Sequence, residues 1–335
     1  MAIKKKGIFF TLISLLFVTL IVISFTTQDF VTLKNKVPVT EATVRIANEH
    51  VQYLESGYIP QSISESAYLA LEALAVRINI TQVPFADEDA FSQAFEEVML
   101  YGTYQGQDID VLNQRRIMTN NTLIYDLARL ENLSASFLNL PTTFNYSTPL
   151  RAAVFQDNST GPYSAAVNIS LGFKVNASSV VITRSTRFTA LLTFDNLTDP
   201  NYLLSTNGRV SRTFKAANQT NWNLATTQDF IAKKKYRYLP QSPTFLGRFY
   251  TGGLADNSSC CGVESLIDAD VIAEVGHTNE SYADCAFFGG GCYTSGILYR
   301  VTGISNEPSY PFRLDSSRVL ETAYNLSDYA IPDPS

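Results

Sequence analysis

The stretch VNISLGFKVNASSVVITRSTRFTALLTF, residues 167–194, decides the fold expected for this chain. Apolar residues take every second position from Val167 to Val175, and alternation resumes from Val180 to Phe194. A period of two is typical of a half-buried strand, and the Asn-Ala-Ser-Ser segment between the two runs is rich in turn residues. The stretch therefore predicts an antiparallel hairpin with one solvent-exposed face, on which Asn168 lies.

Other segments follow two different periods. A shorter strand is predicted to join the hairpin, and another is predicted near the C-terminus, at residues 150–155 and 299–304. Apolar residues at helical spacing predict four helices before the hairpin, at residues 42–55, 62–78, 87–102 and 121–137, and a short one at 322–328. The second helix is expected to begin at a Ser62-x-x-Glu65 capping box, and the third at the carboxylates of Asp87–Asp89.

Helices first and strands afterwards indicate an α+β fold, with an N-terminal transmembrane helix, a helical segment, an antiparallel β-meander and a disulfide-stapled C-terminal region. The expected division of the chain is a basic leader, a transmembrane helix, a stalk, a helical region and a β-rich extracellular region with disulfide-linked loops: residues 1–7, 8–25, 29–60, 61–138 and 144–335.

The run Ile8–Phe25 is 18 residues long and carries no charge, and Lys4–Lys6 precede it. This length is just enough for a membrane-spanning helix, and the lysines predict a cytoplasmic N-terminus and an extracellular remainder. The alternative is a cleaved secretory signal, but residues 24–28 offer no small-x-small cleavage pattern.

The sequence Lys-Lys-Lys-Gly before an apolar helix resembles the class III signal of type IV pilins and their archaeal relatives. The resemblance implies that a peptidase removes the leader after Gly7. Most such pilins have Glu at the fifth mature position, where this chain has Leu12. That difference favours a terminal or minor position in a filament over the repeating subunit.

Twelve Asn-x-Ser/Thr sequons lie beyond the apolar run, against about four expected from composition, which predicts N-glycosylation. They are Asn79, Asn120, Asn132, Asn145, Asn158, Asn168, Asn176, Asn196, Asn218, Asn257, Asn279 and Asn325. The formal net charge of −6 argues against a nucleic-acid partner, which would require basic patches.

The four cysteines lie in the last quarter of the chain: Cys260, Cys261, Cys285 and Cys292. An even number in an exported chain predicts two disulfides. A ring that joins adjacent cysteines is strained, so Cys260 and Cys261 are each expected to reach Cys285 or Cys292. A zinc site fits this spacing poorly, and no metal or cofactor is expected.

No standard catalytic motif occurs, including the G-x-S-x-G elbow, H-E-x-x-H and the P-loop. The two histidines are interpreted as surface or loop residues, His50 off the apolar stripe of its helix and His277 beside a sequon. Lys233–Lys235 are expected at a solvated helix end. A glycosidase-like pair of carboxylates among the 31 acidic residues is not excluded.

Three further stretches carry a family resemblance: residues 197–208, 242–249 with 262–266, and Phe312-Arg-Leu-Asp315. Together with the N-terminus, they resemble uncharacterised archaeal membrane-anchored surface proteins with pilin-like N-termini. The resemblance implies a location and an anchor, with the membrane and other pilin-like or surface proteins as partners. The leading hypothesis is a non-enzymatic surface component, in which a long N-terminal helix packs on the β-meander. The alternatives are a stand-alone ectodomain that binds a partner or glycan and, less favoured, an anchored hydrolase.

Overall fold

The computed structural model describes residues 16–18, 36–146, 150–178, 180–253, 260–276, 279–289, 292, 297–304, 311–320 and 324–333. Gly7, Asn257 and His277 lie outside these ranges, as does the run Ile8–Phe25 apart from three helical residues. Over the described ranges, no helix has both the length and the apolar character required to cross a membrane.

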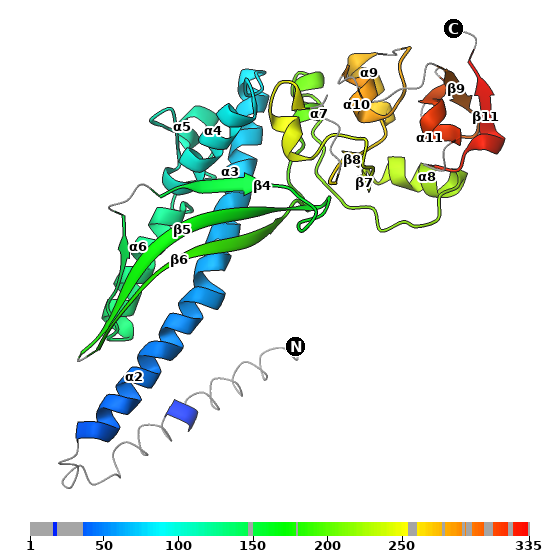
Figure 1. Cartoon of the computed structure of the whole chain (residues 1–335). Coiled ribbons are helices and arrows are strands. Elements are labelled where there is room, and N and C mark those ends of the chain that lie inside the picture. The colour runs from blue at the N-terminus through cyan, green and yellow to red at the C-terminus, as the bar shows by residue number, and fades with distance from the viewer. Residues whose placement is uncertain are drawn as a thin grey trace, which may run out of the picture.

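One long helical rod dominates the N-terminal half (Figure 1). It consists of α2 (Lys36–Tyr53), a π-helical turn η2 (Leu54–Tyr58) and α3 (Ile59–Thr81), about 70 Å in all at 1.5 Å per residue. The prediction of two separate helices, at residues 42–55 and 62–78, is wrong. Pro60 has no N–H for the preceding turn, but it occupies the first turn of α3, directly after the π-helical turn, and the rod continues. Ser62 is therefore buried inside the helix and caps nothing. The boundary expected at residue 60 falls inside the rod.

The predicted hairpin is confirmed as β5 (Ser164–Ala177) and β6 (Val180–Thr193), antiparallel over their whole length. On the other edge of β5, β3 (Thr142–Asn145) pairs with its second half and β4 (Ala152–Phe155) with its first half. Because β3 and β4 run in the same direction, they form one interrupted edge. The sheet is thus an antiparallel meander, and the α+β class with antiparallel sheets is confirmed.

The rod crosses one face of this sheet, and the first hydrophobic core lies between them (Figure 1). The alternating residues of β5 from Val167 to Val175 face this core and are at most 2% exposed. Two predicted helices, α4 (Glu88–Tyr101) and α6 (Leu123–Phe137), pack against the same core. Asp87 caps α4 by accepting the Ala90 N–H at 2.8 Å, as its position in the sequence predicts. Between these helices lie β1 (Thr103–Tyr104), β2 (Gln107–Asp108) and α5 (Ile109–Asn113).

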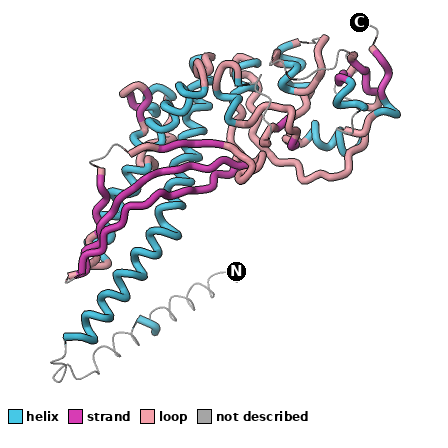
Figure 2. The backbone as a smooth tube through the Cα atoms, viewed as in Figure 1, coloured by secondary structure: helices cyan, strands magenta, loops and turns pink. Residues whose placement is uncertain are grey.

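Beyond β6 the described chain consists of short elements joined by loops (Figure 2). The helices are α7 (Pro200–Ser205), α8 (Leu224–Ala232), η3 (Leu246–Phe249), α9 (Ala269–Val275), α10 (Asp284–Phe287), α11 (Ser316–Leu320) and η5 (Ser327–Tyr329). The strands are β7 (Arg237–Tyr238), β8 (Val263–Glu264), β9 (Leu298–Val301), β10 (Phe312–Asp315) and β11 (Ala330–Pro332). A second hydrophobic core holds this region together. The predicted terminal helix at 322–328 is wrong in its described part, which contains only the 3-10 turn η5, and α11 precedes it.

Candidate functional site

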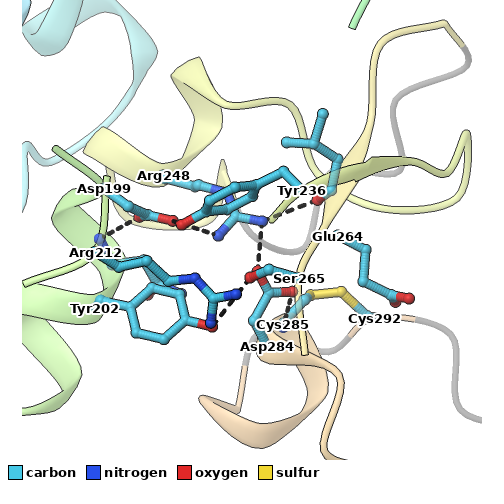
Figure 3. A network of polar contacts seen from close by, with 12 residues as sticks. Asp199, Tyr202, Arg212, Tyr236, Arg248, Glu264, Ser265, Asp284, Cys285 and Cys292 are labelled. Atoms are coloured by element: carbon cyan, nitrogen blue, oxygen red, sulfur yellow. Dashed lines mark hydrogen bonds and ion pairs between the residues drawn. A yellow bond between two sulfur atoms is a disulfide. The ribbon is translucent and has the colours of Figure 1, made fainter. Parts of the chain in front are cut away.

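A cluster of buried charges lies where the two cores meet (Figure 3). Its centre is Arg248 of η3. One guanidinium nitrogen lies 2.8 Å from the Asp199 carboxylate, and the other lies 2.8 Å from the Asp284 carboxylate and 2.9 Å from the Val263 carbonyl oxygen. All three charged side chains are 0% exposed.

Local structure holds each carboxylate in place. Asp199 caps the N-terminus of α7 by accepting the Asn201 N–H at 2.9 Å. Asp284 is the first residue of α10 and accepts the N–H of Cys285 at 2.8 Å. Charges removed from water are tolerated only when they are paired and their remaining atoms are hydrogen-bonded. Burial alone would lower the pKa of Arg248, but Asp284 and Asp199 raise it, so the arginine stays charged.

Hydroxyl groups extend the cluster toward the second core. Tyr236 donates to Asp199 at 2.7 Å, and Ser265 donates to Asp284 at 2.6 Å. Arg212 donates from one nitrogen to the Tyr202 hydroxyl at 2.7 Å and to the Leu266 carbonyl at 2.9 Å. Burial raises the pKa of Tyr202 and of Tyr236, so both phenols remain protonated and available as donors.

A second buried ionic group adjoins the first through β8. Glu264 lies between Val263, whose carbonyl accepts from Arg248, and Ser265, whose hydroxyl donates to Asp284. The Glu264 carboxylate pairs with Arg318 and accepts the Tyr324 hydroxyl at 2.8 Å. Arg318 also pairs with a second carboxylate, Asp315 at the end of β10.

The geometry indicates that this network stabilises the fold. Its charged and phenolic residues are at most 3% exposed, so an external substrate has no path to them. The partners come from segments that are far apart in sequence, and they join residues of both cores. No group of three or more His, Cys, Asp or Glu suited to a metal occurs in the described part of the chain.

A surface cleft of about 430 Å³ lies near the second core. Its polar wall contains Lys234, whose amine lies 2.6 Å from the Asp270 carboxylate and 3.4 Å from the Asp268 carboxylate. The lysine thus pairs with both carboxylates, although one oxygen of Asp268 accepts no hydrogen bond. Lys233–Lys235 do follow the end of α8 as predicted, but the next residue, Tyr236, is fully buried.

The predicted pairing of the cysteines is wrong. All four form disulfides, but the bonds join Cys260 to Cys261 and Cys285 to Cys292. The Cα atoms of Cys285 and Cys292 lie 5.8 Å apart, within the usual range for a disulfide. Cys285 is the second residue of the short helix α10, and its partner Cys292 lies only seven positions further along the sequence.

Every sequon asparagine that the structure describes is accessible to some degree. Nine are exposed, and Asn79 and Asn168 are half-buried. Three lie on the outer face of the meander: Asn145 on β3 pairs with Gly172, which is four residues from both Asn168 and Asn176 on β5. Glycosylation of these sites stays a prediction.

The interpretation of His50 as a solvated residue is wrong. It is 9% exposed, and its Nε2 lies 3.1 Å from the Thr142 hydroxyl of β3. Thr142 donates its own proton to the Leu140 carbonyl, so the imidazole Nε2–H is the donor to Thr142. The histidine thus joins the rod to the sheet.

Sequence reasoning did not find the buried network, although a signal was present. The stretches that carry the family resemblance contain Asp199, Arg248, Glu264, Ser265 and Asp315, all of them network members. A charged residue within an apolar stretch of sequence indicates a buried ion pair, but its partner can be identified only in the folded chain. Comparison with known protein families, curated proteins and solved structures finds no match for this chain.

Proposed function

We propose that this chain is a non-enzymatic, N-glycosylated surface protein, anchored by Ile8–Phe25 and built like a pilin. The observation that carries the proposal is the α2–η2–α3 rod on an antiparallel meander. The rod begins at Lys36, and ten residues separate it in the sequence from the end of the apolar run at Phe25.

The buried polar groups support a structural role over an enzymatic one. Each carboxylate of the network is paired with a buried arginine, and Lys234 in the surface cleft is paired with two aspartates. Accessible sequons across the outer face of the sheet are consistent with an extracellular surface.

The test is the N-terminus of the mature protein in its native host. Trimming after Gly7 leaves Ile8 first, and N-terminal mass spectrometry detects it. Gly7→Leu is expected to block trimming, whereas Lys5→Arg, which keeps the charge, is the matched control. An intact Met1 on the mature protein would exclude the pilin-like proposal and leave an anchored ectodomain.

Leu12 refines the proposal. In pilins a buried glutamate near the start compensates a neighbouring N-terminal amine, and an unpaired charge in an apolar bundle is costly. We therefore propose a terminal or minor position. Quantitative mass spectrometry of isolated filaments should find this chain far below the main subunit; finding it as the main subunit would refute the role given to Leu12.

A further inference from the structure

The outer edge of the meander is an unpaired strand. Strand β6 is 14 residues long and pairs with β5 in an unbroken register. Among the described residues, no strand pairs with its other edge. Figure 1 shows β6 at the margin of the sheet. Such an edge is a template for a further strand.

The hydrogen bonds show which backbone groups point outward. Phe194, just after β6, donates its N–H to the Tyr163 carbonyl at 3.1 Å. The backbone N–H and C=O groups of even-numbered residues in β6 therefore point toward β5, and those of odd-numbered residues point away from it. The outward carbonyl of Leu191 accepts the Ser64 hydroxyl of α3 at 2.9 Å, which covers that end. The open stretch is therefore Val181–Thr189.

Two arginines are the features of this stretch that could protect an edge strand from pairing. It contains no proline, no lysine and no bulge. Arg184 points to the inner face and pairs with Glu55 of η2 at 3.5 Å. Arg187 is then the one charged side chain on the outer face of β6.

We propose that the open edge of β6 binds the same edge of a second copy, antiparallel, with the two-fold axis at Ser185. The open stretch is nine residues long, and Ser185 is its centre, so this register pairs the whole stretch with itself. Each Arg187 then faces a Thr183, and each Val181 faces a Thr189. No like charges meet, and the outward N–H and C=O groups of both strands are satisfied.

The distribution of sequons leaves this edge accessible. Strand β6 contains no asparagine, whereas the neighbouring strand β5 carries Asn168 and Asn176. Their side chains stand on the outer face of the sheet, roughly perpendicular to the direction in which a further strand would add. Glycans there would cover the face of the sheet without covering its edge.

The symmetry fixes how the two copies are oriented. Along the rod, Glu55 pairs with Arg184 and Ser64 then bonds Leu191, so the rod runs in the same direction as β6. A two-fold axis that makes the β6 strands antiparallel makes the rods antiparallel too. If the chain is anchored as proposed above, the paired copies sit in opposing membranes. This last step rests on the proposed function, whereas the pairing itself does not.

Site-specific cross-linking of the full chain in detergent tests the pairing. Ser185→Cys places two thiols across the axis, where directly hydrogen-bonded residues have Cα atoms about 5.5 Å apart, a distance that a disulfide can span. Mild oxidation is expected to give a covalent dimer. Ser170→Cys, which is also exposed but lies on β5, is the matched control and should stay monomeric. No dimer with Ser185→Cys, or equal dimer with both variants, would overturn the proposal.

Charge variants at Thr183 test the register without a cross-link. Thr183→Arg would face Arg187 of the second copy, and Thr183→Glu would face it with the opposite charge. Sedimentation of the full chain over a range of concentrations should show dimerisation weakened about tenfold by the first and strengthened by the second. Equal effects of the two substitutions would exclude this register.

Membrane geometry separates the two proposals. Two vesicle populations are prepared with differently tagged Ser185→Cys chains and then mixed. Cross-linked pairs that carry both tags are expected. Pairs that form only within one population would overturn the antiparallel arrangement between membranes. Failure of Gly7 trimming, by contrast, leaves the edge pairing unaffected.

Discussion

At the scale of single residues, the phenol of Tyr236 gives the sharpest test of the buried network. Its hydroxyl donates to a fully buried carboxylate, Asp199, at 2.7 Å. Tyr236→Phe leaves that carboxylate with one donor fewer, and hydrogen bonds to charged groups contribute about 1.5–3 kcal/mol. We expect a loss of that size in the free energy of unfolding, measured by urea denaturation. Tyr238→Phe removes an exposed hydroxyl and should change it by less than about 0.5 kcal/mol.

His50 links stability to pH. Burial lowers the pKa of His50, so the folded state resists protonation that the unfolded chain accepts. The unfolded state therefore binds more protons as the pH falls below the ordinary pKa of 6.5, and stability is lost through the window down to the lowered pKa. Between pH 7.5 and pH 5, we expect the melting temperature of the native chain to fall more than that of the His50→Gln variant. Identical dependence of the melting temperature on pH in the two proteins would show that protonation of His50 does not affect stability.

At the scale of elements, the alternation on β5 separates two adjacent side chains. Phe173 is 2% exposed in the first core, whereas Lys174 is exposed on the outer face. Phe173→Ala should lower the free energy of unfolding by about 3–5 kcal/mol, because it removes contacts and leaves a cavity. Lys174→Ala should change it by less than about 0.5 kcal/mol. A similar loss from both would contradict the burial of one face.

The same periodicity explains which elements could be predicted from the sequence. The hairpin, α4 and α6 have long, regular apolar patterns, and all three are confirmed. The continuity of the rod through Pro60 was not predictable, because a proline in the first turn and a capping box look alike whether a helix begins or continues. The short elements beyond residue 200 span too few residues to display a period, so their ends were missed.

At the scale of the whole molecule, the candidate site was the least predictable part. Its members lie between Asp199 and Tyr324, and only the packing of two cores brings them together. The sequence contains the charged residues but not their partners. The disulfide pairing was also mispredicted, because the bonds join cysteines that are adjacent or seven residues apart in the sequence, and composition does not indicate which cysteines pair.

The network's position between the cores predicts how the molecule unfolds. Trp222, the single tryptophan, packs on Phe230 and Tyr324 of the second core, so its fluorescence reports that core. Far-UV circular dichroism reports mainly the rod, which belongs to the first core. In the native chain Arg248 couples both regions, and the two signals should change at the same urea concentration.

Arg248→Ala should separate those two transitions. It leaves Asp199 and Asp284 buried without their cation, and breaking a buried pair in this way costs about 3–5 kcal/mol. Both carboxylates begin elements that pack around the second core, so the fluorescence midpoint should move to lower urea while the dichroism midpoint moves less. Arg209→Ala removes an arginine that is 67% exposed and pairs with Glu274 of the same region, and its transitions should stay coincident. Coincident transitions in Arg248→Ala would mean that apolar contacts, and not the ionic network, join the two cores.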